Sequence, residues 1–329
     1  MTTPSTPTQP LVVFLDSDVL SGHGDLDLSP LHINGVRFKQ YPRTASEDIV
    51  ERAAQAEVIV TNKCQFTAEI LARLPRLRLI LEAATGYDNI DITAARQQHI
   101  DVCNVAGYAR MPVAQTIVAY LLDHCNRVAH YAHESRQGAW TQCKDFCRLA
   151  HPTLELHHKR VAIVGFGSIG ATLAEMLRPF GTEVFAVTSK KQTELPTYVK
   201  KISLEKAFAT CFAVSLNCPL TPSTREFVNK SLLAHAHPDL LLINTARGAV
   251  VNEYDVAQAL YEDRLGAYYA DVLCQEPPKE NNPLLSAPRC HITPHVAWAT
   301  IEARNRILQA LAQNLQAFLQ GKPLNNIVN

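Results

Sequence analysis

The sequence predicts an α/β protein made of two domains, each built around a parallel sheet. A chain of 329 residues is long enough for two domains. Short apolar segments alternate with segments of helical pattern along most of it, which is typical of parallel sheets covered by helices. A glycine-rich turn at residues 165–170 lies half way along, so the roughly 160 residues before it are enough for a separate domain.

The expected elements follow from this alternation. The residues at 112–131 form the longest apolar helical segment, which would link the domains or bury a face against a partner. Strands are expected at 11–15, 57–61, 78–81, 102–104, 161–164, 183–187, 212–216, 240–244 and 267–272. Helices are expected at about 49–54, 67–74, 92–98, 112–131, 168–177, 252–266 and 301–319.

The glycine-rich turn matches the dinucleotide-binding fingerprint, because a strand, the turn, a helix and a second strand follow in order. Gly165 permits the tight turn, Gly167 lets the backbone approach a pyrophosphate, and Gly170 lets the helix pack closely on the strand. The helix N-terminus offers N–H groups and the positive end of its dipole. We therefore expect a Rossmann-type domain that binds NAD or NADP. The expected cofactor contacts of the turn are Gly165, Gly167, Ser168, Ile169 and Gly170.

The end of the second strand bears on the choice of cofactor. An acidic residue is expected there to bind the ribose 2′-hydroxyl of NAD, but the position holds Thr188, followed by Ser189, Lys190 and Lys191. Two hydroxyls and two cations without a carboxylate suit a 2′-phosphate, which slightly favours NADP. The alternative is that the lysines are solvated and NAD binds through backbone contacts.

Composition excludes several classes. Lys and Arg balance Asp and Glu at 31 each, which gives no general attraction to nucleic acid or an anionic membrane. Residues 1–10 are polar and Pro-rich, unlike a signal peptide. Nine cysteines, an odd number, suit reduced thiols in the cytoplasm. Cys143, Cys147, His151, His157 and His158 match no zinc spacing, so no metal is expected.

Three polar residues at strand ends or in loops after the glycine-rich turn suit carbonyl reduction. Ligands bind beyond the carboxyl ends of strands in such sheets. A protonated His295 can deliver a proton to the oxygen on which negative charge develops, and Glu276 favours the charged imidazolium and fixes its ring. Arg247 can hold a carboxylate with two hydrogen bonds. Each residue alone is weak evidence, since it suits a structural role as well.

With these residues the chain resembles the D-isomer-specific 2-hydroxyacid dehydrogenases over about residues 11–328. Asn-Thr-Ala-Arg247-Gly, Asp271-Val-Leu through Glu276-Pro-Pro and Thr-Pro-His295-Val-Ala-Trp resemble the three signatures of that family. The resemblance implies that Arg247 binds substrate and that Glu276 pairs with His295, the acid/base. It also implies a discontinuous, flavodoxin-like substrate domain of residues 1–104 and 296–329, with the dinucleotide-binding domain, 105–295, inserted in it.

Four stretches, residues 83–91, 102–108, 138–140 and 295–299, most resemble the glycerate dehydrogenases, or hydroxypyruvate reductases, of this family. This likeness implies NAD(P)H-dependent reduction of hydroxypyruvate to D-glycerate, with glyoxylate as a side substrate, by a homodimer joined through residues 112–131. Another 2-hydroxy acid, or a corepressor-like nucleotide sensor, remains an alternative. Arg110 departs from the small residues usual there, and Trp140 suits either a partner's site or packing. The resemblance further implies substrate contacts at Ala84, Thr85 and Gly86, and cofactor contacts at Cys218, Pro219, Thr245, Ala246 and Asp271.

Overall fold

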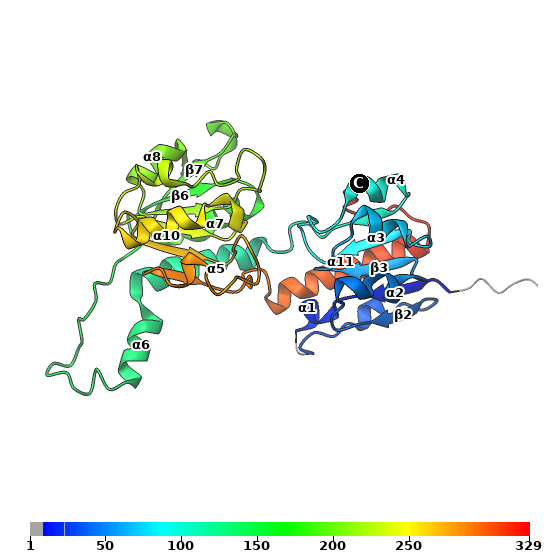
Figure 1. Cartoon of the computed structure of the whole chain (residues 1–329). Coiled ribbons are helices and arrows are strands. Elements are labelled where there is room, and N and C mark those ends of the chain that lie inside the picture. Colours follow the sequence, from blue (N-terminus) through cyan, green and yellow to red (C-terminus); the bar gives the residue numbers. More distant parts are fainter. Residues whose placement is uncertain (1–8, 23) are drawn as a thin grey trace, which may run out of the picture. The chain divides into compact units, whose positions relative to one another are not determined.

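The computed structural model describes residues 9–22 and 24–329, and the chain divides into two compact units (Figure 1). Unit 1 comprises Met1–Tyr108 and Ala299–Asn329, and unit 2 comprises Ala109–Trp298. Unit 2 is therefore inserted in unit 1. The sequence placed the two junctions at 104/105 and 295/296, a few residues earlier.

Unit 1 is built on a five-stranded, all-parallel sheet with the order β2-β1-β3-β4-β5, which is the flavodoxin-like order. Its central strands β1, β3 and β4 are buried throughout, as expected for a sheet covered on both faces. The strands are β1 (Leu11–Phe14), β2 (Arg37–Gln40), β3 (Val58–Thr61), β4 (Leu79–Glu82) and β5 (Asp101–Cys103). The helices are α1 (Ser17–Ser21), α2 (Ile49–Ala53), α3 (Ala68–Ala72), α4 (Ile92–Gln97) and α11 (Ile301–Leu319), with 3-10 turns η1 (Ser29–Leu31) and η2 (Ser46–Asp48).

The last 31 residues of the chain complete unit 1. The amphipathic helix α11 buries Ile307, Leu308, Leu311 and Leu315, and it packs against β4. Arg304, near its start, forms a bidentate ion pair with Asp25, with N–O distances of 2.7 and 2.6 Å. Beyond the helix the chain returns to the sheet, where the Val328 N–H donates to the carbonyl of Val102.

Unit 2 is built on a seven-stranded parallel sheet with the order β12-β11-β10-β9-β6-β7-β8. Successive strands run outward from β6 in one direction and then, from β9, in the other, so the topological switch point lies between β6 and β9. The strands are β6 (Arg160–Val164), β7 (Glu183–Val187), β8 (Val199–Lys201), β9 (Ala213–Leu216), β10 (Leu241–Asn244), β11 (Ala267–Ala270) and β12 (Cys290–Ile292).

Helices cover both faces of this sheet. Alternate residues of β6 face opposite ways: Val161 and Ile163 join the core formed with α5 and α7, while Ala162 and Val164 join the core formed with α8 and α10. The helices are α5 (Arg110–Asn126), α6 (Val128–Arg136), α7 (Ser168–Leu177), α8 (Leu204–Thr210), α9 (Lys230–Leu233) and α10 (Glu253–Tyr261), with 3-10 turns η3 (Arg178–Phe180), η4 (Gln192–Glu194), η5 (Gly248–Val250) and η6 (Pro283–Leu285). None of the helices in the described part of the chain is long and apolar enough to cross a membrane.

The expectation of one helix over residues 112–131 is wrong, because the chain breaks at Arg127. This residue adopts the left-handed conformation, with φ of +51°, and separates α5 from α6. Its N–H closes α5 on the carbonyl of Asp123, and its guanidinium donates to the carbonyl of Pro152. No proline or glycine marks the break, which is why the apolar pattern extends across it. The helix α6 and the segment after it lie apart from the sheet of unit 2 (Figure 1).

Candidate active site of unit 2

The three glycines of the turn after β6 have different roles. Gly165 has φ of +93°, and a Cβ there would lie 2.7 Å from the Asn217 carbonyl oxygen. A Cβ at Gly170 would collide with the Gly165 carbonyl oxygen. A Cβ at Gly167 would meet nothing within 4 Å. Packing within the chain therefore requires glycine at 165 and 170, whereas the open space at Gly167 suits close approach by a ligand.

The start of α7 faces this open space with its backbone. Gly167 is the N-cap of the helix and no side chain caps it, so Ser168 and Ile169 form its first turn. The first N–H groups of a helix have no partner within it and carry the positive end of its dipole. This end of the helix suits a pyrophosphate, as the sequence predicted.

Two buried polar atoms follow the neighbouring strands β9 and β10. Oδ1 of Asn217 and Oγ1 of Thr245 are shielded from water and have no hydrogen-bond partner among the described residues. Cys218 follows Asn217 and is partly buried, Pro219 is exposed, and Ala246 donates its N–H to Asn244. Buried polar atoms are normally paired, so the orphaned atoms fit contacts with a bound dinucleotide. Thr245 was predicted from the sequence. Asn217 was not, although it directly follows the strand β9.

The residues after β7 place cations close to the glycine turn. The Lys190 ammonium lies 5.8 Å from the centre of the Phe166 ring, between Gly165 and Gly167 in the chain. Lys190 donates its N–H to the Thr188 hydroxyl, and its carbonyl accepts from Nζ of Lys201. Lys201, at the end of β8, brings a cation that the sequence analysis missed. Ser189 is exposed beside them.

His295 and Glu276 form a close pair. Nδ1 of His295 lies 2.6 Å from Oε2 of Glu276, and the two side chains are 33% and 36% exposed. The other oxygen of Glu276 accepts from the Leu273 N–H at 3.0 Å, which fixes the carboxylate. With Nδ1 engaged, Nε2 of the imidazole is the nitrogen left for a reacting group, which is the arrangement of a general acid held by a carboxylate.

Asp271 fixes the loop that carries His295. Its carboxylate is buried and accepts hydrogen bonds from the N–H groups of Val296 and Ala297, at 2.9 and 2.8 Å, and from the Thr293 hydroxyl. The hydroxyl of Tyr120 on α5 also bonds to Thr293, and burial raises the pKa of Tyr120 to about 12, so it stays protonated. These contacts make Asp271 a positioning residue for His295. The cofactor contact implied for it stays a prediction.

Arg247 follows β10 and η5 begins directly after it. A Cβ at Gly248 would overlap the backbone of Leu273 and Cys274, so only glycine lets this turn lie against the loop that leads to Glu276. The Arg247 carbonyl accepts from the Asn244 side chain, and its guanidinium donates to the Ala246 carbonyl. Unit 2 thus brings Arg247, Glu276 and His295 to the carboxyl edge of neighbouring strands.

The predicted substrate loop, Ala84 to Gly86, lies in unit 1 after β4. The Thr85 hydroxyl donates to the Val105 carbonyl at 2.8 Å, and Asn104 donates to the Thr85 carbonyl at 2.7 Å. The Val105 N–H donates to the Ala84 carbonyl. The loop is therefore fixed to the segment that follows β5, with Thr85 exposed.

Two buried carboxyl groups lie at the same edge of the unit 1 sheet, and the sequence analysis missed both. Asp16, after β1, accepts from the N–H groups of Asn62 and Lys63. Glu82, the last residue of β4, accepts from Asn89, and its Oε1 is buried without a partner among the described residues. Burial raises the pKa of both, that of Glu82 well above its ordinary value, which favours the protonated form of Glu82.

A parallel sheet with this switch point, a glycine turn open to a dinucleotide and a carboxylate–imidazole pair define an NAD(P)-dependent dehydrogenase. The comparisons with known proteins give the family. Residues 118–297 match "D-isomer specific 2-hydroxyacid dehydrogenase, NAD binding domain". The chain belongs to this family and is an oxidoreductase.

Relatives agree over nearly the whole length. The hydroxypyruvate reductase of Blautia hydrogenotrophica is 32% identical over 97% of this chain and 99% of its own length. The glycerate dehydrogenase of Methylorubrum extorquens is 35% identical over 95% of this chain and 98% of its own. A Thermus thermophilus protein of known structure superposes with a TM-score of 0.84 at 27% identity, over 97% of this chain and 100% of its own.

Proposed function

We propose that this protein reduces a small 2-oxo acid to the D-2-hydroxy acid, with hydroxypyruvate as the main substrate, D-glycerate as the product and glyoxylate as a second substrate. The observation that carries the proposal is the His295–Glu276 pair, 2.6 Å apart at the carboxyl edge of the sheet. Relatives called hydroxypyruvate reductase, glycerate dehydrogenase and glyoxylate reductase support this choice of substrates.

Each residue of the proposed site has its own role in carbonyl reduction. The bound nicotinamide supplies the hydride to the carbonyl carbon. His295 donates a proton from Nε2 to the carbonyl oxygen, and Glu276 stabilises the imidazolium before the transfer and fixes the ring. Arg247 holds the substrate carboxylate through its guanidinium. A substrate this small needs few other contacts.

For the cofactor, we propose that NADPH is preferred over NADH. Lys190 and Lys201 both lie near Thr188, where an NAD-specific site would carry a carboxylate. The open space at Gly167 and the orphaned oxygens of Asn217 and Thr245 fit the dinucleotide in either form. The 2′-phosphate alone would distinguish the two.

We further propose a homodimer. The helix α5 already packs on α7, so the exposed apolar surface of this region lies on α6 and the segment after it. Four apolar side chains there have exposed fractions of 55–90%: Val128, Trp140, Phe146 and Leu149. Such a concentration of exposed apolar side chains is typical of an interface. Light scattering should give the mass of two chains, and a monomer mass would contradict this.

The cytoplasm is the proposed compartment, because all nine cysteines are unpaired thiols in the structure. Free thiols are usual where glutathione and thioredoxin keep cysteine reduced. Fractionation of the native host would test this.

The test of function is NADPH and NADH oxidation with hydroxypyruvate, glyoxylate, pyruvate and 2-oxoglutarate. Hydroxypyruvate should give the highest kcat/KM. His295→Ala and Glu276→Gln should each lower kcat by about 10²–10⁴ while leaving NADPH binding intact. Tight nucleotide binding without turnover of any of the four acids would reject the proposal and favour a nucleotide sensor.

A further inference from the structure

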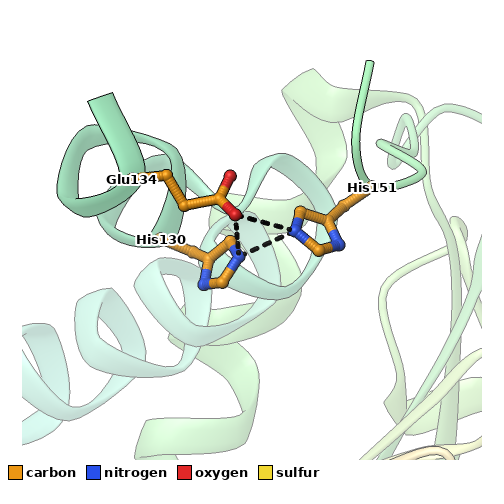
Figure 2. A group of neighbouring side chains, drawn as sticks. All are labelled: His130, Glu134 and His151. Atoms are coloured by element: carbon orange, nitrogen blue, oxygen red, sulfur yellow. Dashed lines mark hydrogen bonds and ion pairs between the residues drawn. The ribbon is translucent and has the colours of Figure 1, made fainter. Parts of the chain in front are cut away.

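Three potential metal ligands meet where the segment that returns to β6 lies against α6. His130 and Glu134 are one turn apart on the helix, and His151 comes from the segment that returns to β6 (Figure 2). Nε2 of His130 lies 2.9 Å from Nε2 of His151. Oε1 of Glu134 lies 3.6 Å from the first nitrogen and 3.5 Å from the second.

These separations fit the edges of a zinc coordination tetrahedron. With bonds of about 2.0–2.1 Å to nitrogen and oxygen, two tetrahedral ligand atoms lie roughly 3.3 Å apart. The three distances here, 2.9, 3.5 and 3.6 Å, lie on either side of that value. With these three separations a point about 2 Å from all three atoms exists, and a tetrahedral ion there would have one further position for a water molecule.

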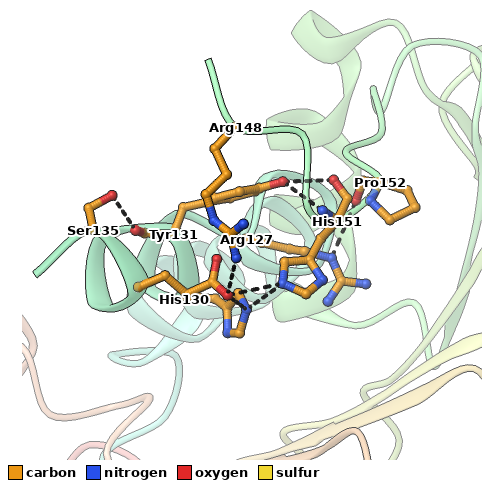
Figure 3. A network of polar contacts seen from close by, with 8 residues as sticks. Arg127, His130, Tyr131, Ser135, Arg148, His151 and Pro152 are labelled. Carbon is orange, nitrogen blue, oxygen red and sulfur yellow. Dashed lines mark hydrogen bonds and ion pairs between the residues drawn. The ribbon is translucent and has the colours of Figure 1, made fainter. Parts of the chain in front are cut away.

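The segment that carries His151 is fixed to α6 by contacts that do not use the three ligand atoms. The Tyr131 hydroxyl donates to the His151 carbonyl at 2.8 Å and accepts from its N–H at 3.0 Å (Figure 3). Arg127 donates to the Pro152 carbonyl, and the Leu154 N–H donates to the Cys125 carbonyl. Such outer contacts hold metal ligands in place and reduce the entropy lost on binding.

The charges of the cluster also suit a cation. The Glu134 carboxylate lies beside the two imidazoles, which bind a metal ion as neutral ligands. The second oxygen of Glu134, Oε2, is buried and has no hydrogen-bond partner among the described residues. The same is true of Nε of Arg148. Arg148 donates a hydrogen bond to Oε1 at 3.1 Å. With a metal ion on Oε1, Oε2 would accept this hydrogen bond instead.

We propose that His130, Glu134 and His151 bind a divalent transition-metal ion, zinc by preference. Two imidazole nitrogens and one carboxylate oxygen in tetrahedral array are a zinc ligand set, whereas calcium and magnesium prefer oxygen ligands alone. The sequence places His151 near Cys143 and Cys147, a spacing that predicted no metal site. In the structure His151 lies beside His130 and Glu134 instead, which the spacing of these residues in the sequence does not indicate.

The ion would link α6 to the segment before β6. Residues 135–150 lie between the ligands Glu134 and His151, so binding closes this stretch of chain into a loop. The stretch carries the exposed apolar side chains Trp140, Phe146 and Leu149. Zinc would order it and thereby reduce the exchange of its amide hydrogens with solvent.

The test is titration of the EDTA-treated full-length protein with zinc chloride, followed by calorimetry and by metal analysis after gel filtration. Wild type should retain one zinc more per chain than His130→Ala or His151→Ala, and each variant should bind zinc at least about 100-fold more weakly at this site. His133→Ala is the matched control, since His133 is exposed on the same helix and is not one of the three ligands. It should bind zinc as wild type does.

Hydrogen exchange followed by mass spectrometry gives the second readout. Zinc should slow exchange in residues 135–150 of wild type and of His133→Ala but not of the ligand variants, whose circular dichroism should match wild type. Equal zinc content and affinity in wild type, His130→Ala and His151→Ala would overturn the proposal, as would an absence of zinc binding in wild type. Because neither readout uses turnover, the result is independent of the proposed reaction.

Discussion

Gly248 lies directly against the backbone of Leu273, so close that a β-carbon on the glycine would overlap the Leu273 carbonyl carbon. Leu273 in turn donates its N–H to Glu276. The contact therefore joins the turn after Arg247 to the loop that fixes the carboxylate partner of His295. The turn after Arg247 and the loop that leads to Glu276 can lie this close together only because residue 248 has no side chain.

Replacing Gly248 with alanine should damage both stability and activity. The added methyl group must displace the loop after β11, and overpacking of this kind costs about 1–3 kcal/mol. Tm should fall, and kcat should fall further than the loss of folded protein explains, because Glu276 moves with the loop. Thermal denaturation and steady-state kinetics check this, and an unchanged Tm would contradict the packing argument.

Gly167→Ala is the matched comparison, since its methyl group meets no atom of the chain within 4 Å. Tm of the protein without cofactor should stay within about 1 °C of wild type, because surface substitutions of this kind change stability by less than ~0.5 kcal/mol. Kd for NADPH should rise at least about tenfold, since the methyl group occupies space next to the pyrophosphate. Fluorescence titration measures it; unchanged affinity would place the dinucleotide elsewhere.

Asp271→Asn separates positioning of His295 from binding of the nicotinamide. The amide group of asparagine would turn an N–H donor toward the Ala297 N–H, which now donates to the carboxylate at 2.8 Å. A buried donor without an acceptor costs about 1–3 kcal/mol, so the loop carrying His295 should shift. We expect kcat to fall about tenfold or more with little change in Kd for NADPH. A rise in Kd without loss of kcat would instead support the cofactor contact.

Lys190→Ala tests the choice of cofactor. If its ammonium binds the 2′-phosphate, kcat/KM for NADPH should fall about tenfold or more, since hydrogen bonds to charged groups contribute about 1.5–3 kcal/mol. The value for NADH should change little, because NADH carries no phosphate there. Lys200→Ala is the control, as Lys200 lies on β8 next to Lys201 and contacts Glu183 instead. Equal losses with both cofactors would contradict the proposed preference.

Glu82→Gln tests the buried, protonated carboxyl group of unit 1. Since burial raises its pKa in the folded chain, the unfolded chain loses this proton first as the pH rises above the ordinary value of 4.5. The folded state then binds more protons than the unfolded state, so the free energy of unfolding falls with rising pH. Glutamine resembles the protonated form and cannot ionise. Tm of the variant, relative to wild type, should therefore rise from pH 5 to pH 8; parallel curves would show an ionised Glu82.

The sequence predicted those elements whose signals are local. The bounds of α7, β7 and α11 agree with the structure. A glycine turn precedes α7, Gly181 separates α7 from β7, and an amphipathic repeat marks α11. The two parallel sheets were confirmed, since buried central strands read as apolar runs. The family resemblance implied the pairing of His295 with Glu276, and in the structure the two residues follow the neighbouring strands β12 and β11.

Other features depend on contacts that no local pattern records. The edge strands β2 and β8 are largely exposed and polar, so they lack the apolar signal of the strands beside them. Arg127 ends α5 through its bond to Pro152, which lies 25 residues further on. The meeting of His130 and His151 likewise depends on the course of the segment between them, fixed by Tyr131.

The insertion of unit 2 within unit 1 sets an order of completion during synthesis. By Trp298 the ribosome has delivered every residue of unit 2 and all five strands of the unit 1 sheet, but not α11. The apolar side chains of β4 that α11 covers stay open until the last 31 residues emerge. A nascent chain without α11 would therefore hold a complete unit 2 and an incomplete unit 1 sheet, and the uncovered surface of β4 would be the part that chaperones have to protect.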